Sequence, residues 1–307
     1  MKIKLPSVGA LLIILAAVLW ALDGVLRRDL FTLPPLVIVF YEHLFGTVLL
    51  LPSVLSMLQT KLTKRVIGLT LLIALLSGLL GTLWFTAALV KVQFIPFSVV
   101  FLLQKLQPIF AISAAALLLK EKVTRNYLWY AGAALVAAFF VTFPNGMVNV
   151  STGSQTAIAG LLAVGAAFAW GTSTVFSKLL LKEVDHTVAT ALRFSATTVL
   201  CVGALVLTRQ DPNMLMLDAT QVGRLLVIAV STGMVALWIY YRGLRQTQAK
   251  ISTLLELVFP LLAVIIDTFM YKTLLAPSQY VAAAVLVAIV YQLGILQKKE
   301  TAVQLEK

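Results

Sequence analysis

Long apolar runs, interrupted by charged residues, Pro, Gly or Asn, recur along the whole chain. Each run is close to the roughly 20 residues that a helix needs to cross the hydrocarbon core of a bilayer. The pattern predicts ten membrane-spanning helices at about 8–27, 34–56, 66–90, 95–119, 127–143, 157–180, 187–208, 222–244, 251–271 and 277–296. The charge-free stretch 126–177 is too long for one crossing, so we expect it to turn back at Pro144-Asn145-Gly146.

The composition indicates lipid rather than water as the main solvent. Hydrophobic residues make up 61% of the chain, charged residues 12%, and the mean hydropathy is +0.99, which excludes a soluble enzyme. The net charge of +12 would suggest nucleic acid in a soluble protein, but here the cations flank apolar segments, so we expect membrane lipids and no nucleic acid as partners. With residue 1 in the cytoplasm, sixteen of the 24 Lys and Arg residues flank the inner side and six the outer side, so the positive-inside rule places both termini in the cytoplasm.

Few residues could carry out chemistry. Cys201 is the single cysteine, and His43 and His186 are the two histidines. The sequence therefore offers no disulfide, no metal-ligand set, no nucleophile paired with a base and no phosphate-binding glycine loop. We expect no enzyme activity, no cofactor, no metal and no drive by ATP, which leaves ion or solute gradients as the energy source.

The first half of the chain also aligns with the second half in sequence. A shift of 150 positions aligns Trp20 with Trp170, and a shift of 152 aligns Pro108 with Pro260. Five spans per repeat is an odd number, so the second repeat enters from the opposite side, and such inverted repeats can expose a central site to either face in turn. The expected organisation is a first repeat at 1–146, an extracytoplasmic linker at 147–156, a second repeat at 157–296 and a polar cytoplasmic tail at 297–307.

The order and spacing of several short motifs resemble those of the EamA type of the drug/metabolite transporter superfamily, over nearly the whole chain. The residues that carry the resemblance are Leu19-Trp20, Ala169-Trp170, Arg193, Ala88-Leu89, Gly243-Leu244, Pro108, Pro260, Lys120-Glu121 and Val123-Thr124. Two departures are His43, where an Arg is usual, and Thr273, where a Glu is usual. The resemblance implies alternating-access transport of small organic metabolites through a cavity lined by helices one to four and six to nine, with helices five and ten outside it.

An ionisable side chain at the middle of a membrane helix costs about 2.5–3.5 kcal/mol on insertion scales, so such residues are candidates for function. Lys105 stands in the fourth predicted span beside Gln104 and Gln107, and Pro108 removes a backbone donor at the same depth. We expect this group to bind substrate and Pro108 and its counterpart Pro260 to act in gating. The alternative for Lys105 is an ion pair with Glu42 or Glu256 that ties helices together.

Other candidates lie on the neighbouring predicted helices. Glu256 begins a polar stripe on the ninth span, where it binds substrate or, alternatively, is solvated or pairs with Lys250 or Arg193. Glu42 and His43 could carry a coupling proton, and the alternative is a carboxylate neutralised by Lys105 or by its own neighbour. Arg193, the counterpart of His43, is a gating candidate that could instead snorkel to the interface.

Aromatic residues could add a wall for an apolar or cationic substrate. The candidates are Trp20, Trp84, Trp238 and Tyr241, together with Tyr240, and the alternative for each is packing or an interfacial belt. Asp23 precedes Arg27 by four residues, which predicts an ion pair within one helix.

Taken together, the residues predict an all-α inner-membrane secondary transporter, monomeric or a homodimer. Ten helices in two inverted repeats would enclose a central cavity for amino acids or similar zwitterionic or amphipathic solutes, with a proton or another ion as the coupling partner. The alternative is a lipid-handling or scaffold protein that transports no small solute.

Overall fold

The computed structural model describes residues 6–58, 62–91, 103–104, 106–147, 153–259, 261–262, 265, 269 and 275–305, and this part of the chain is all helical. Within it, six helices are long and apolar enough to cross a membrane, and two shorter apolar helices, Pro35–Leu49 and Gln107–Leu118, accompany them. The prediction of an all-helical chain with repeated membrane spans is therefore confirmed for the described residues.

The first half of the chain forms one series of helices. They are α1 (Val8–Arg28), α2 (Pro35–Leu49), α3 (Leu51–Leu58), α4 (Lys64–Ile73), the π-helix η1 (Ala74–Gly81), α5 (Thr82–Val90), α7 (Gln107–Leu118) and α8 (Arg125–Thr142). The short 3-10 turn η3 (Pro144–Gly146) follows, with Asn145 at a φ of 55°, so the chain turns where the sequence predicted.

The second half repeats the series. Its helices are α9 (Gly153–Leu180), α10 (His186–Leu207), the 3-10 turn η4 (Pro212–Leu215), α11 (Ala219–Ile228), the π-helix η5 (Ala229–Val235), α12 (Ala236–Gln246), α13 (Ala249–Leu255) and α15 (Pro277–Leu305). Several helices begin at a side-chain cap, which satisfies backbone N–H groups that have no partner within the helix. Asp218 and Gln221, for example, form a reciprocal capping box at the start of α11.

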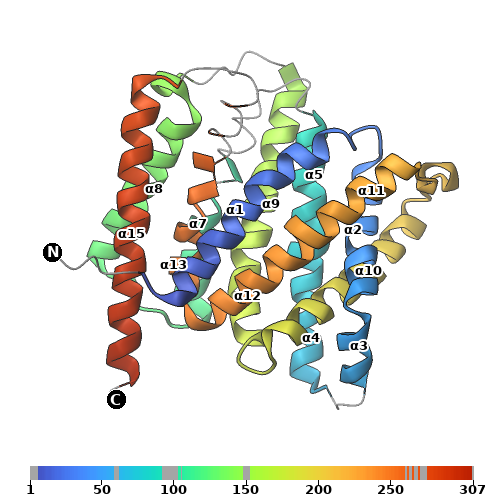
Figure 1. Ribbon diagram of the computed structural model, residues 1–307, viewed down its shortest axis with the longest axis horizontal. Coiled ribbons are helices and arrows are strands. Elements are labelled where there is room, and N and C mark those ends of the chain that lie inside the picture. The colour runs from blue at the N-terminus through green and yellow to red at the C-terminus, as the bar shows by residue number, and fades with distance from the viewer. Residues whose placement is uncertain are drawn as a thin grey trace.

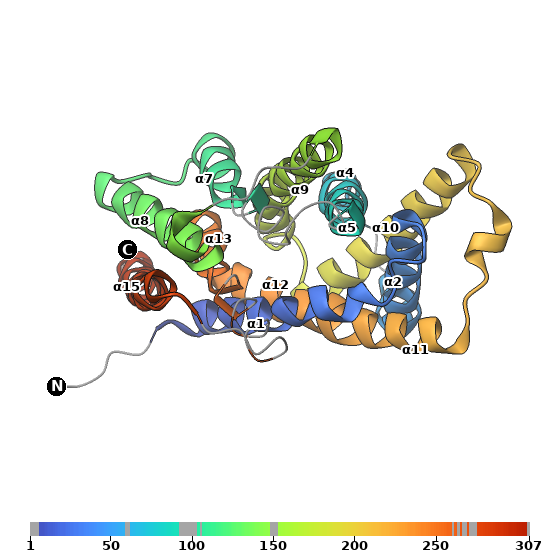
Figure 2. The same cartoon turned by 90° about the horizontal axis from the view of Figure 1, so that it is seen from above.

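The two halves pack across each other rather than side by side. Helix α1 packs against α12 of the second half, α9 packs against η1 and α5 of the first, and α2 packs against α10. Figure 1 shows α1 and α9 running in opposite directions along the bundle, as expected for two repeats of opposite orientation. Helices α8 and α15 lie side by side at one edge in both views (Figure 1, Figure 2), where the Gln279 side chain donates to the Val141 carbonyl at 2.9 Å.

Three local features differ from the predicted spans. The span predicted at 34–56 is broken into α2 and α3, because Pro52 lacks an N–H and its ring cannot follow the carbonyl of Val48 in a regular helix. The third span of each half contains a π-helical segment, η1 and η5. The segment predicted as a polar tail from residue 297 continues α15 as far as Leu305.

Candidate functional site

A cavity lies between the two halves of the bundle. Its empty volume is about 1150 Å³ including the opening to solvent, and its described lining comes from α1, α2, η1, α5 and α7 of the first half and α9, α10, η5, α12 and α13 of the second. Among the described lining residues, none belongs to α8 or α15, which pack against each other at the edge. The cavity is large enough for an organic solute of ordinary metabolite size.

Aromatic rings line two regions of this cavity. The rings of Trp20 and Tyr240 lie 5.1 Å apart between centroids, and those of Phe85 and Trp170 lie 5.2 Å apart. The Trp170 indole N–H donates to the Ser77 carbonyl at 3.1 Å. That carbonyl lies in the π-helix η1, where the regular backbone pattern is interrupted, so it is available to side chains. Two aromatic surfaces, one from α1 and α12 and the other from α5 and α9, therefore face the same cavity.

A hydrogen-bonded amide and carboxylate, from different repeats, also line the cavity. Gln107 at the start of α7 donates through Nε2 to Glu256 Oε2 at 2.9 Å, and Glu256 caps the carboxyl end of α13. Gln104 and Pro108 also line the cavity. Gln107 of the first repeat is thus joined to Glu256 of the second, and the predicted candidate Gln104 lines the same cavity. Lys105 and Pro260, the remaining members of the predicted groups, lie outside the described residues.

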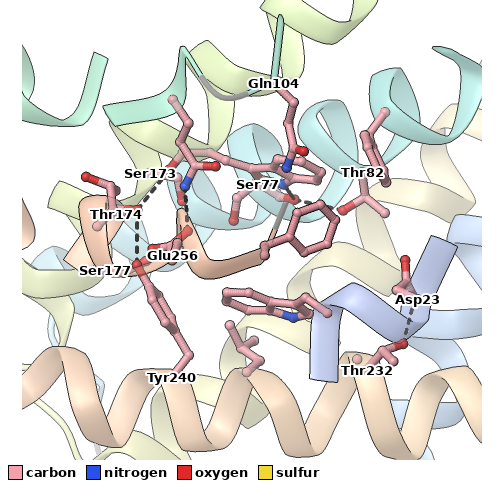
Figure 3. Close-up of a pocket in the computed structure, with 18 of the residues that line it drawn as sticks. Asp23, Ser77, Thr82, Gln104, Ser173, Thr174, Ser177, Thr232, Tyr240 and Glu256 are labelled. Atoms are coloured by element: carbon pink, nitrogen blue, oxygen red, sulfur yellow. Dashed lines mark hydrogen bonds between the residues drawn. The ribbon is translucent and has the colours of Figure 1, made fainter. Parts of the chain in front are cut away.

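A charged cluster joins α1, α2 and η5 at the cavity wall. Arg27 pairs with Asp23 on its own helix through Nε and with Glu42 of α2 through Nη2, the second contact at 2.7 Å. The Thr232 hydroxyl of η5 donates to Asp23 at 2.6 Å (Figure 3). Arg27 is only 3% exposed, Glu42 6% and Thr232 3%. The predicted Asp23–Arg27 pair is confirmed, and Glu42 shares the same arginine.

A histidine and a second arginine stand beside this cluster. His43 Nδ1 lies 2.8 Å from the Val39 carbonyl, and because a carbonyl can only accept, this nitrogen carries the hydrogen. Arg193 of α10 lines the same cavity, half-buried, and its Nε is buried without a hydrogen-bond partner. No ion pair reaches Arg193 within the described ranges. Its charge is therefore turned toward the cavity rather than toward a carboxylate.

Hydroxyl groups line the side of the cavity opposite Asp23 and Thr232, as the close-up in Figure 3 shows. Ser177 lies 3.1 Å from the Tyr241 hydroxyl, and Thr174 lies 3.4 Å from that of Tyr240. Ser173 of the same helix, α9, also lines the cavity. Tyr241, which the sequence analysis named as a binding candidate, is among the residues that line the cavity. Uncharged donors and acceptors of this kind suit a solute with hydroxyl or carbonyl groups.

Two predicted aromatic candidates pack between helices, away from the described cavity lining. Trp84 is directed at α9, where its ring covers Gly165 so closely that a Cβ on that glycine would lie 2.9 Å away. Trp238 donates to the Thr187 hydroxyl at 2.9 Å and lies against the His186 ring, at the start of α10. Neither belongs to the described cavity lining. Leu237 and Tyr241 of α12 do, and Trp238 is rotated by about 100° from Leu237 along the helix.

Several lining residues were not singled out from the sequence as binding candidates. Trp170 was visible as the repeat partner of Trp20, and that signal could have placed it in the cavity. Ser77 and Thr232 occupy the same position within the two π-helices, which no hydrophobic pattern reveals. In the described part of the chain, no group of three or more His, Cys, Asp or Glu residues could hold a metal ion.

Comparison with known proteins identifies the family. The EamA-like transporter family matches at residues 7–143 and again at 157–294. The riboflavin transporter ImpX of Fusobacterium nucleatum subsp. nucleatum is 37% identical over 290 residues, which are 92% of this chain and 95% of that protein. The pseudopaline exporter CntI of Pseudomonas aeruginosa is 28% identical over 201 residues, 65% of this chain and 66% of that protein.

A solved structure, named only as the crystal structure of a protein, supports the fold. It superimposes with a TM-score of 0.75 at 15% sequence identity and covers 96% of this chain and 98% of its own. The family match in both halves confirms the resemblance drawn from the sequence and the presence of two repeats. The family match and the relative of 37% identity confirm that the protein is a transporter and not an enzyme. The chain belongs to the EamA-like transporter family and is a multi-pass membrane protein.

Proposed function

We propose that this protein carries a flat, riboflavin-like solute across the membrane through the cavity between its two repeats. The observation that carries the proposal is the pair of aromatic surfaces, Trp20 with Tyr240 and Phe85 with Trp170, that face one space together with amide and hydroxyl groups. The identity of 37% with a riboflavin transporter over nearly the whole of both chains supports the same class of solute.

The aromatic surfaces suit a fused heteroaromatic ring system. Offset or tilted contact between aromatic faces contributes about 0.5–1.5 kcal/mol beyond the burial of apolar area. Trp20 comes from α1 and Trp170 from α9, so each repeat supplies one indole to the solute. A solute held between them contacts both repeats, and its binding responds to any movement of one repeat against the other.

The polar groups suit the edges of such a solute. Gln107 and Glu256 offer an amide and a carboxylate side by side, and the serine and threonine hydroxyls of α9 suit a hydroxylated chain. Arg193 presents guanidinium N–H groups that suit carbonyl or ring-nitrogen acceptors. A polar group that a bound solute covers without a matching partner loses more free energy than it gains when the partner is present.

We further propose the orientation and the transport cycle. The asymmetry of flanking Lys and Arg residues supports ten spans with both termini in the cytoplasm, as in a transporter of the cytoplasmic membrane. The opposite directions of α1 and α9 support alternating access, in which the two repeats exchange conformations around a fixed site. Family membership favours transport over the lipid-handling or scaffold alternative.

A zwitterionic solute, such as an amino acid or a related metabolite, is the second candidate. The observation in its favour is that Arg193 and Glu256, of opposite charge and from different helices, line the same cavity. An exporter of pseudopaline is also among the relatives. This candidate requires solute charges at both ends, whereas a riboflavin-like solute requires ring stacking.

Counterflow in proteoliposomes distinguishes the two candidates. Purified protein in vesicles preloaded with unlabelled riboflavin should take up labelled riboflavin, and a panel of amino acids should compete weakly. We expect Trp20→Ala to weaken riboflavin binding about 10-fold. Trp238→Ala is the matched control, because this tryptophan lies outside the described lining, and it should leave binding unchanged. Riboflavin counterflow that is absent, or equally fast in Trp20→Ala, would exclude the first candidate.

A further inference from the structure

We propose that the Asp23–Arg27–Glu42 cluster is the site of the coupling proton, with Glu42 as the group that takes it up. The inference rests on the proposed function, because it assigns the energy source of that transport. The cluster consists of the buried side chains of Arg27 and Glu42, the partly buried Asp23 and the Thr232 hydroxyl, all at the cavity wall.

The charges in the cluster do not balance. Arg27 contributes one positive charge, while Asp23 and Glu42 contribute two negative charges when both are ionised. Burial of an excess charge is costly, and one proton bound to a carboxylate removes the excess. The proton adds to a carboxylate oxygen from water on the open side of the protein and leaves to water on the other side, so no other reactant is needed.

The hydrogen bonds indicate which carboxylate takes the proton. Asp23 accepts from Arg27 Nε and from the Thr232 hydroxyl, and both bonds favour its charged form. Glu42 is paired through Oε2 with Arg27 Nη2. Its Oε1 faces the backbone of η5, where a Cβ built on Gly233 would lie 3.4 Å away. Glu42 is thus the carboxylate with fewer donors and with an oxygen at the contact between α2 and η5.

That contact joins the two repeats. Asp23, Arg27 and Glu42 belong to the first repeat, and Thr232 and Gly233 belong to the second. Protonation of Glu42 weakens its pairing with Arg27, which loosens the junction of α1, α2 and η5. A junction that holds in one protonation state and loosens in the other couples proton movement to the movement of the repeats.

The charged and titratable neighbours of Glu42 come from several helices. His43 follows it on α2, Arg193 faces the same cavity from α10, and the Cys201 thiol of α10 interacts electrostatically with Glu42. Helix η5 supplies Thr232, which does not titrate, and at the outer end of α11 Arg224 pairs with Asp29. Among the described residues that line this cavity, Arg193 is therefore the cation without an ion pair, and its charge opposes protonation of Glu42.

The repeat-related side of the cavity lacks these charges. At a shift of 150 positions, Asp23 corresponds to Ser173 and Arg27 to Ser177. Ser177 contacts the neutral hydroxyl of Tyr241 at 3.1 Å. At these related positions, the first repeat thus carries ionisable side chains and the second carries hydroxyls.

Proteoliposomes with a defined pH difference test the proposal. In the wild-type protein, an inward pH gradient should drive riboflavin accumulation, and pyranine inside the vesicles should report proton entry with it. Glu42→Gln should lose both signals and keep riboflavin counterflow, which needs no net proton movement and shows that the variant is folded. Glu42→Asp keeps an ionisable carboxylate and should restore the gradient response. Glu183→Gln, at an exposed ion pair with Arg65, is the matched control and should behave as the wild type.

A second variant gives a readout that a structural role would not change. Arg193→Gln removes a positive charge that opposes protonation, so it should move the midpoint of the pH dependence upward by about one unit. Proton-coupled accumulation that persists in Glu42→Gln would overturn the proposal, as would a wild-type protein that exchanges riboflavin but ignores the pH gradient. A wild-type protein without riboflavin counterflow would instead refute the proposed solute, and the pyranine assay would then be run with the amino-acid panel.

Discussion

Two arginines line the same cavity in opposite electrostatic situations, so replacing them should change stability in opposite directions. Arg27 is 3% exposed and pairs with Asp23 and Glu42. Arg193 is half-buried, and no described carboxylate forms an ion pair with it. We expect Arg27→Gln to destabilise the empty protein and Arg193→Gln to stabilise it.

The sizes follow from what each substitution leaves behind. Without Arg27, two carboxylates stay buried without a counter-charge, and breaking a buried pair in this way costs about 3–5 kcal/mol. Without Arg193, the protein no longer inserts an unpaired cation, which costs about 2.5–3.5 kcal/mol at the centre of a membrane helix. Because Arg193 is only half-buried at a water-accessible cavity, we expect a smaller gain of about 1 kcal/mol.

Solute binding should change in the opposite sense for Arg193. If its guanidinium donates to an acceptor of the bound solute, losing a hydrogen bond of a charged group costs about 1.5–3 kcal/mol, or about 10- to 150-fold in Kd. Arg193→Lys keeps the charge but loses the planar fork of donors, so it should recover only part of the affinity.

The assay is thermal unfolding of the purified protein in detergent, with and without riboflavin, for wild type and both glutamine variants. Arg245→Gln is the control, because this exposed arginine pairs with Asp185 at 3.0 Å outside the cavity. A melting temperature for Arg193→Gln as low as that for Arg27→Gln would show that Arg193 has a structural partner. Unchanged riboflavin affinity in Arg193→Gln would show that it does not contact the solute. Either result refutes the reasoning.

Two further predictions concern packing and helix capping. Gly171→Ala would place a Cβ 2.6 Å from the Gln107 carbonyl, so it should separate α7 from α9 and lower stability by about 1–3 kcal/mol in thermal unfolding, whereas Gly132→Ala, with nothing within 4 Å, should not. Asp185→Ala removes the N-cap of α10, which accepts from the Thr187 N–H at 2.9 Å, and should cost about 1 kcal/mol at neutral pH. Partial burial alone would raise the pKa of Asp185, but the hydrogen bonds from Thr187 and the interaction with His186 together outweigh it and lower the pKa. The stabilisation is therefore complete above the unfolded pKa of about 4 and disappears as the pH falls through the lower folded value, so the difference between wild type and Asp185→Ala should vanish in strong acid.

The hydrophobic pattern predicted most of the helices because lipid imposes a strict length on an apolar run. It could not predict where a span breaks or winds differently. The break between α2 and α3 depends on Pro52, and a proline within an apolar run either bends or ends a helix according to its packing. The π-helices depend on backbone hydrogen bonds that have no counterpart in hydropathy.

The site was predicted where a rare residue type carried the signal. Glu42, Glu256 and Arg193 stood out because charge is costly in lipid, and all three line the cavity. Tryptophans gave a weaker signal, because an indole packs equally well between helices, as Trp84 does over Gly165. Serine and threonine are common in membrane helices, and only the fold shows which of their hydroxyls face the cavity.

The differences between the repeats matter more for function than their similarity. Two identical inverted repeats would give inward-open and outward-open states of equal free energy. Each state would contain the same contacts, made by the other repeat. Here, the charge-assisted bond of Asp23 with Thr232 joins the two repeats, whereas the residue related to Asp23 is the neutral Ser173. Hydrogen bonds to charged groups are roughly twice as strong as neutral ones, so the proposed cycle has one preferred resting state. A proton or a solute that weakens the charged side shifts the two states toward equality, and only a carrier with unequal halves can be driven in this way.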